Sequence, residues 1–257
     1  MNNDTRFSAA HIRFAALALV LAATSAQAAP EPSFEPNSIQ TVNFNSPRRA
    51  YIKAPGPLEI YVEGAMKDDP KVYPAVIQKL TESLEEVFAA LPAHSRTQMR
   101  TTQYFLMFGT RSPAGGLKGG MRFVTAGSRN ELHDSRWQGG IVIYSADNLM
   151  AMTIPQVKRA LAHEMAHAWQ LTHWHSRHPP IYGAWEAAAT KGLYKNVLDY
   201  KGRVIASAYA GKNQLEYFAE LSAAYFVGLH YEPFTREGLK TYDPAGYRMV
   251  EMLWAPL

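Results

Sequence analysis

The sequence predicts an α+β fold, in which a small twisted sheet in the N-terminal half packs against a mostly helical C-terminal half. Two observations support this class. Short runs rich in β-branched and aromatic residues, typical of strands, end near Tyr144, and helical patterns dominate after that point. The chain shows no internal repeat. We therefore expect a single folded domain, over residues 58–257, and not a repeat architecture.

The N-terminal half contains four predicted strands and one helix. Residues 73–91 have apolar side chains near helical spacing and predict an amphipathic helix. A Gly-rich loop over residues 112–120 lacks the Lys-Ser/Thr ending of a phosphate-binding loop, which favours a mobile hairpin or a loop beside a cleft. The predicted strands are residues 58–62, 103–108, 121–124 and 139–144.

The most informative helix begins at Thr153. Thr153 is a predicted N-cap, Pro155 lies in the first turn, and Gln156 completes a capping box. The run from Val157 to Trp169 contains neither Gly nor Pro, so the helix continues through it. Further helices are predicted at residues 184–198, 214–226 and 244–253.

Residues 1–28 have the pattern of a signal peptide. Basic residues precede an apolar run over residues 14–23, and Ala26-Gln27-Ala28 has the small-x-small form that signal peptidase cleaves. We expect cleavage after Ala28 and export to the periplasm or the medium. Residues 29–57, which are rich in Pro, are predicted to be an exposed leader or a segment that wraps an edge of the fold.

Composition excludes several classes of protein. The chain has no Cys, which removes disulfides, thiolate metal ligands and a lipid-modified Cys. Its net charge of +4 is mild, and its basic residues are not interleaved with aromatics as in nucleic-acid-binding proteins. No segment reaches the length of uninterrupted apolar sequence that a membrane-spanning helix needs. We expect no nucleic-acid partner and no membrane span, while the oligomeric state stays open.

The run His163-Glu164-Met165-Ala166-His167 has the HExxH pattern of zinc hydrolases. On a helix, residues i and i+4 lie on the same face, so both imidazoles can reach one ion. Glu164 is rotated away from that pair, toward the coordination position left open for water. The motif therefore predicts half of a catalytic zinc site with Glu164 as general base.

Two residues compete to be the third zinc ligand. Glu216 lies on the predicted helix at 214–226, and His173 follows the motif at the spacing of HExxHxxxxxH enzymes. Those enzymes have a Gly midway that turns the chain, whereas Gln170 occupies that position here and favours helix. His173 would then be carried along the helix, about 9 Å beyond His167. We favour Glu216.

The joint pattern resembles the lethal-factor-type zinc peptidases of the gluzincin class. The matching elements are HExxH, then Tyr209, then Glu216 within Glu-aromatic-Phe-Ala-Glu, which ends at Glu220. The tail from Tyr231 to Pro244 also resembles secreted bacterial proteins with the same core. The resemblance implies a zincin-like domain in which Zn²⁺ is held by His163, His167 and Glu216. It also implies that the strand at residues 139–144 lines the cleft and pairs with an extended peptide backbone. It further implies that Glu164 is the general base, that Tyr209 stabilises the oxyanion, and that Glu220 orients a zinc-bound His.

Each role that the resemblance implies has a structural alternative. Glu216 could instead complete a capping box with Asn213. Tyr209 could be a packing residue in a loop, and Glu220 a solvated or salt-bridged surface residue. We expect a zinc peptidase that acts on peptides or proteins. A cell-wall peptide amidase with the same zinc chemistry and a non-catalytic secreted binding module remain as alternatives.

Overall fold

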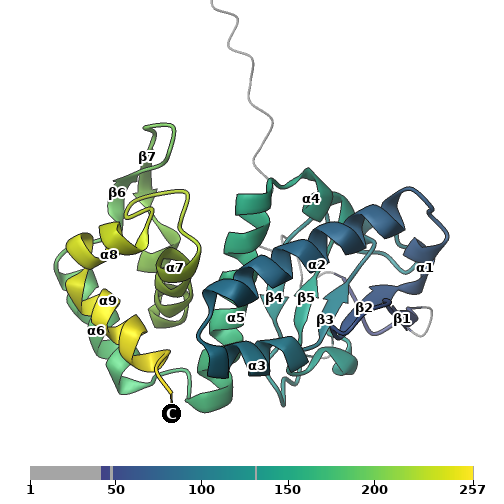
Figure 1. Ribbon diagram of the computed structural model, residues 1–257, viewed down its shortest axis with the longest axis horizontal. Helices are drawn as coiled ribbons and strands as arrows, with labels where there is room; N and C mark the ends of the chain where they lie inside the picture. The colour runs from purple at the N-terminus through teal and green to yellow at the C-terminus, as the bar shows by residue number, and fades with distance from the viewer. Residues whose placement is uncertain (1–41, 47–48, 131, 257) are drawn as a thin grey trace, which may run out of the picture. The chain divides into compact units, whose positions relative to one another are not determined.

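A five-stranded mixed sheet forms the N-terminal half of the described chain, which comprises residues 42–46, 49–130 and 132–256 of a computed structural model (Figure 1). The strand order is β1-β2-β3-β5-β4, so β1 and β4 are the edges. The pairs β2-β3 and β3-β5 are parallel, whereas β1 and β4 pair antiparallel with their neighbours. The strands are β1 (Tyr51–Lys53), β2 (Ile60–Glu63), β3 (Tyr104–Leu106), β4 (Met121–Phe123) and β5 (Ile141–Ile143).

Side chains of the central strands alternate between two apolar clusters, as the two-residue period of a strand requires. Tyr104 and Leu106 of β3 enter the larger cluster with α2 and α5, while Phe105 enters a smaller cluster that includes Phe44 and Trp137. The helices of this half are α1 (Gly64–Lys67), α2 (Val72–Ala90), α3 (Ala93–Thr101), α4 (Ala146–Ala151) and α5 (Ile154–His173). Short 3₁₀ turns lie at Gly109–Arg111 and Ser135–Trp137.

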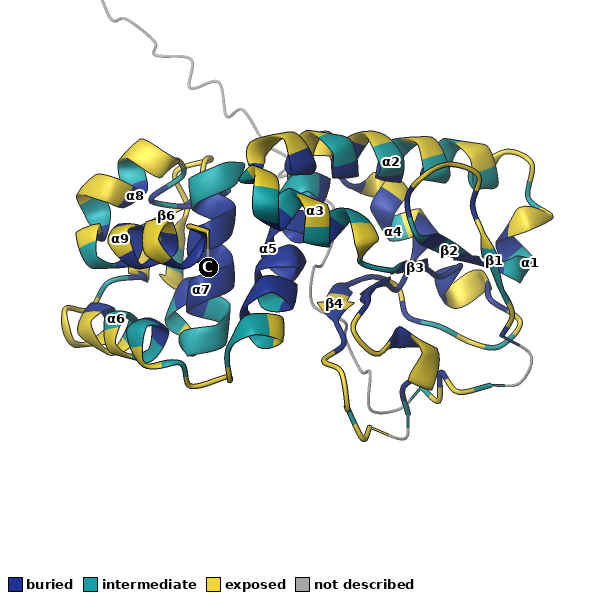
Figure 2. Ribbon diagram, turned by 60° about the horizontal axis from the view of Figure 1, so that its bottom comes forward, coloured by how far each residue is buried: buried dark blue, intermediate teal, exposed yellow. Residues whose placement is uncertain are grey.

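The C-terminal half is built around α7 (Gln214–Phe226), which packs against α5 and against α6, α8 and α9 (Figure 1). Most of α7 is buried, as its dark colour in Figure 2 shows. The remaining elements are α6 (Pro179–Thr190), β6 (Lys195–Leu198), β7 (Val204–Ser207), a 3₁₀ turn (Tyr209–Gly211), α8 (Arg236–Tyr242) and α9 (Pro244–Leu253). The α+β class is therefore confirmed, with α5 between the sheet and the helical half.

The boundary predicted at residue 58 moves toward the N-terminus, because β1 pairs with β2 and both Phe44 and Arg49 are buried. Since β1 is an edge strand, this part of the predicted leader fits the alternative of a segment that wraps an edge of the fold. The predicted helix at 184–198 ends early, because Gly192 adopts a positive φ of 70° and the chain then forms the β6-β7 hairpin. The predicted signal peptide and the first part of the predicted leader lie outside the described residues. None of the helices within the described ranges is both long and apolar enough to cross a membrane.

Candidate metal centre

Helix α5 carries His163 and His167 one turn apart. Gln156 accepts a hydrogen bond from the Thr153 N–H at 2.7 Å, which fixes the start of the helix and hence the direction in which the motif faces. The Nε2 atoms of the two imidazoles lie 3.1 Å apart. Two neutral acceptors at this distance repel each other, so the pair needs a cation or a shared proton between the rings.

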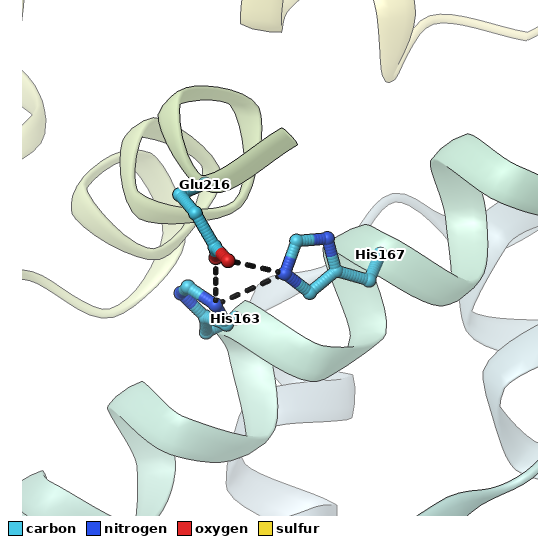
Figure 3. A group of neighbouring side chains, drawn as sticks. All are labelled: His163, His167 and Glu216. Atoms are coloured by element: carbon cyan, nitrogen blue, oxygen red, sulfur yellow. Dashed lines mark hydrogen bonds and ion pairs between the residues drawn. The ribbon is translucent and has the colours of Figure 1, made fainter. Parts of the chain in front are cut away.

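Glu216 completes a triangle with the two imidazoles (Figure 3). Its Oε2 lies 3.1 Å from Nε2 of His163 and 3.2 Å from Nε2 of His167. A tetrahedral zinc ion with bonds of about 2.0–2.1 Å separates its ligand atoms by about 3.3 Å. The observed edges are slightly shorter, so the donor set and its spacing fit a divalent ion. No other group of His or carboxylate side chains in the described residues meets the same spacing.

The first turn of α7 is capped by Asn213, so the carboxylate of Glu216 is not needed as a cap. The side chain of Asn213 accepts hydrogen bonds from the backbone N–H groups of Leu215 and Glu216, at 2.9 and 3.0 Å. Asn213 is thus the N-cap, as expected. The carboxylate of Glu216 lies against the imidazoles and is therefore placed as a ligand would be.

Glu220 follows Glu216 by one turn and contacts the other side of His163. Its Oε1 accepts a hydrogen bond from Nδ1 of His163 at 2.7 Å, which leaves the Nε2 lone pair facing the triangle. Burial lowers the pKa of His163, but contacts with Glu216 and Glu220 outweigh burial and hold that pKa well above its ordinary range. Burial raises the pKa of Glu216, but the two imidazoles outweigh it and hold that pKa well below its ordinary range.

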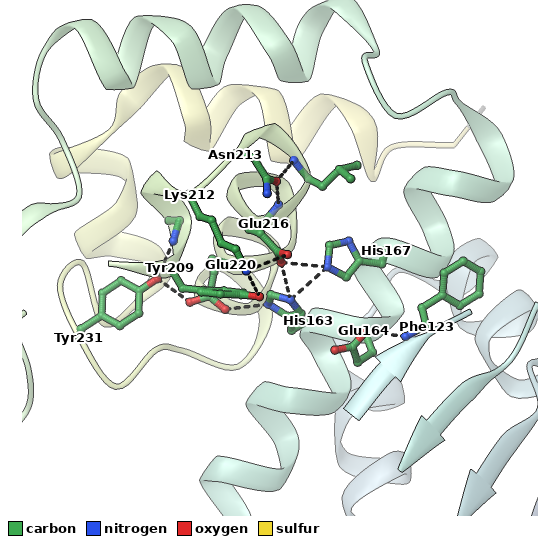
Figure 4. Close-up of polar contacts among 12 residues, drawn as sticks. Phe123, His163, Glu164, His167, Tyr209, Lys212, Asn213, Glu216, Glu220 and Tyr231 are labelled. Atoms are coloured by element: carbon green, nitrogen blue, oxygen red, sulfur yellow. Dashed lines mark hydrogen bonds and ion pairs between the residues drawn. The ribbon is translucent and has the colours of Figure 1, made fainter. Parts of the chain in front are cut away.

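Glu164 lies beside the triangle and contributes no atom to it. Its Oε2 accepts the backbone N–H of Phe123 in β4 at 2.7 Å (Figure 4). Burial raises the pKa of Glu164, although the nearby imidazoles oppose this shift. A carboxylate whose pKa is raised by burial is a stronger base than an exposed one, which favours the role of general base.

Tyr209 approaches the centre from the 3₁₀ turn that precedes α7. Its ring centroid is 5.7 Å from that of His163. The ammonium of Lys212 donates a hydrogen bond to the Tyr209 hydroxyl oxygen at 3.0 Å and lies 4.0 Å from Oε1 of Glu216. The hydroxyl hydrogen of Tyr209 is therefore free to point elsewhere, and Lys212 adds positive charge beside it.

His173 does not join the group. It is the last residue of α5, and its Nε2 hydrogen-bonds Oε1 of Gln98 at 2.8 Å. Its ring packs on Trp169 with centroids 4.1 Å apart. The helix continues through Gln170, as its propensity predicted, and carries His173 away from the other two imidazoles.

A peptide-binding strand was predicted at residues 139–144, and the structure corrects this assignment. Strand β5 pairs on both sides, with β3 and β4, so it has no free edge. The free edge beside Glu164 belongs to β4. The order of strands across a sheet depends on which strands pair in the tertiary structure. The residues of β5 do not by themselves show whether it lies at an edge or inside the sheet.

Sequence patterns also missed residues that contact the centre. Phe123 acts through a backbone N–H, which side-chain motifs cannot reveal. Tyr231 donates a hydrogen bond to Oε2 of Glu220 from the segment after α7, at no characteristic spacing. Lys212 lies one turn before Glu216, and this spacing was the only available signal for it.

Comparisons of the chain with protein-family models, with curated proteins and with solved structures find no match.

Proposed function

We propose that this chain is an exported, zincin-like zinc peptidase that hydrolyses peptide bonds in peptides or proteins. The observation that carries the proposal is the triangle of His163, His167 and Glu216, whose three atoms lie 3.1–3.2 Å apart. The carboxylate of Glu164 lies beside this triangle and outside it. Two imidazoles and a carboxylate also suit other first-row divalent metals. Zinc is proposed because a carboxylate base beside an open site suits hydrolysis.

Bound zinc would lower the pKa of a water ligand to about 7 and polarise the carbonyl of the scissile bond. Oε2 of Glu164 is held by the Phe123 N–H, so Oε1 is the atom available to accept a proton from that water. The protonated Glu164 then donates to the amine that leaves, which regenerates the base. The Tyr209 hydroxyl, which accepts from Lys212, can donate its own hydrogen to the developing oxyanion.

Strand β4 supports an extended substrate. The backbone of Gly120 and Val124 forms hydrogen bonds toward β5 and the loop before it. Successive residues of a strand direct their N–H and C=O groups to opposite sides, so those of Met121 and Phe123 face the free edge of the sheet. The Phe123 N–H reaches Glu164, and the remaining groups of this edge can pair with a peptide backbone whatever its side chains. Binding there would bring a peptide bond close to the general base.

The test is cleavage of a proteome-derived peptide library by the purified, zinc-loaded protein. We expect chelator-sensitive cleavage that is lost in the Glu164→Gln variant. Release of products only from purified peptidoglycan would assign the chain to the cell-wall amidases. Folded protein that binds zinc and cleaves neither substrate would contradict an enzymatic role and favour a binding module.

A further inference from the structure

A directional chain of hydrogen bonds links the 3₁₀ turn at Tyr209 to the proposed zinc ligands (Figure 4). The backbone N–H of Ala210 donates to the hydroxyl oxygen of Tyr231 at 3.3 Å. That hydroxyl donates to Oε2 of Glu220. Oε1 of Glu220 accepts from Nδ1 of His163 at 2.7 Å. Tyr231 therefore uses one hydroxyl both as acceptor and as donor.

Burial makes this arrangement hard to replace by water. The exposed fraction of Tyr231 is 1%, and that of Glu220 is 8%. A buried carboxylate oxygen that loses its donor bears the full desolvation cost, so the side chain of Glu220 would turn toward another donor. Such a turn moves the acceptor that orients His163. Nδ1 of His167 has no hydrogen-bond partner among the described residues. The bond from Nδ1 of His163 to Glu220 is therefore the only one in the described chain that orients either imidazole through its Nδ1 atom.

The backbone holds Tyr231 in place independently of the metal centre. Tyr231 forms an isolated β-bridge with Asp199, next to the β6-β7 hairpin, and its carbonyl accepts from Phe234 N–H at 2.8 Å. The neighbouring Glu232 N–H donates to the Leu198 carbonyl at 2.9 Å. The hydroxyl is thus presented from a fixed backbone, as preorganisation of a metal site requires.

We propose that Tyr231 is a positioning residue of the metal centre. It holds Glu220 in the orientation that aims Nε2 of His163 at the ion, and it ties the turn that carries Tyr209 to the same support. The inference rests on the proposed function, because it assigns to Tyr231 an effect on zinc affinity. It adds a contribution from the segment after α7, which supplies no ligand itself.

The experiment compares the zinc affinity of Tyr231→Phe with that of a matched control, by competition with a chromophoric chelator. Tyr194→Phe is the control, because Tyr194 is also buried and donates to a buried carboxylate, that of Asp243, at 3.0 Å. Asp243 keeps a second donor in Tyr217, and its hydrogen bonds with Tyr194, Tyr217 and Gly246 involve none of the three proposed zinc ligands. Both variants lose one hydroxyl of the same kind, and thermal unfolding of the metal-free proteins checks that each is folded.

We expect Tyr231→Phe to weaken zinc binding about threefold to tenfold, below the 10- to 100-fold typical of a direct partner of a metal ligand. Tyr194→Phe should bind zinc like the wild type. Stabilisation of the folded protein by a fixed zinc concentration should fall in parallel, since it depends on the dissociation constant.

A double-mutant cycle tests whether Tyr231 acts through Glu220. In the Glu220→Gln background, Tyr231→Phe should have little further effect on zinc affinity, because the chain is already broken. Three results would overturn the role of Tyr231 and leave the proposed function intact. They are equal zinc affinity of Tyr231→Phe and wild type, an equal loss of affinity in the Tyr194→Phe control, and fully additive losses in the cycle. Absence of zinc binding by the wild-type protein would instead overturn the proposed function on which the inference rests.

Discussion

Replacing Glu164 by Gln should separate metal binding from chemistry. No atom of Glu164 belongs to the ligand triangle, and the carbonyl oxygen of Gln can accept the Phe123 N–H that Oε2 accepts at 2.7 Å in the wild type. Zinc affinity should therefore be unchanged. The variant lacks a basic oxygen, and a positioned general base contributes about 10²–10⁴-fold to rate, which corresponds to about 2.7–5.4 kcal/mol of transition-state stabilisation.

The same substitution has a stability effect of defined sign in the metal-free protein. Burial raises the pKa of Glu164 above its ordinary value of 4.5, so the folded state resists its ionisation. Well below pH 4.5 the group is protonated in both states, and its burial carries no charge penalty. As the pH rises from 4.5 through the folded-state pKa, ionisation is easier in the unfolded state, so the folded state is progressively destabilised. Metal-free Glu164→Gln should consequently melt at a higher temperature than wild type at pH 7, and at a similar temperature at pH 4.

The assay combines the rate of peptide cleavage, zinc content and thermal melting for wild type, Glu164→Gln and a control. Glu186→Gln is a suitable control, because it removes an exposed carboxylate from α6 without touching the centre. We expect the control to behave like wild type in all three measurements. Cleavage by zinc-loaded Glu164→Gln at the wild-type rate would refute the assignment of Glu164 as base.

Three further predictions concern the ligands, the tyrosine and the metal. Glu216→Gln should lower zinc affinity more than about 100-fold, beyond the loss typical of a residue that hydrogen-bonds to a metal ligand. His173→Ala should leave zinc affinity unchanged in chelator competition, and the opposite pattern would move the ligand role to His173. Tyr209→Phe should lower kcat about 10²–10³-fold with little change in KM, and a change in KM alone would make Tyr209 a binding residue. Removing zinc with a chelator should abolish cleavage and lower the melting temperature, and added zinc should restore both, whereas activity that survives complete removal would contradict a metal mechanism.

The sequence located the helices that carry the centre because their boundaries have local chemical signals. Thr153 and Gln156 mark the start of α5, and Asn213 marks the start of α7. The predicted span of residues 214–226 coincides with α7. Spacing within α5 then places both imidazoles on one face, and only the distance between α5 and α7 required the tertiary structure.

Features that depend on long-range pairing could not be predicted in this way. The strand at 139–144 looks like a substrate-binding strand, yet pairing with β3 and β4 leaves it no free edge. Strand β1 lies in a Pro-rich stretch and is stabilised by β2. The hydroxyl of Tyr231 reaches Glu220 because the chain folds back after α7. No local sequence pattern predicts this contact. One overlooked local signal was Gly192, which ends α6 early.

The zinc content of the purified protein shows whether His163, His167 and Glu216 hold a metal ion. Wild-type protein and a His163→Ala, His167→Ala double variant are loaded with zinc, dialysed against metal-free buffer and measured by elemental analysis, with circular dichroism to show that both are folded. We expect about one zinc per wild-type chain and none in the double variant. A folded wild-type protein without zinc, or zinc retained by the double variant, would contradict the proposed metal centre.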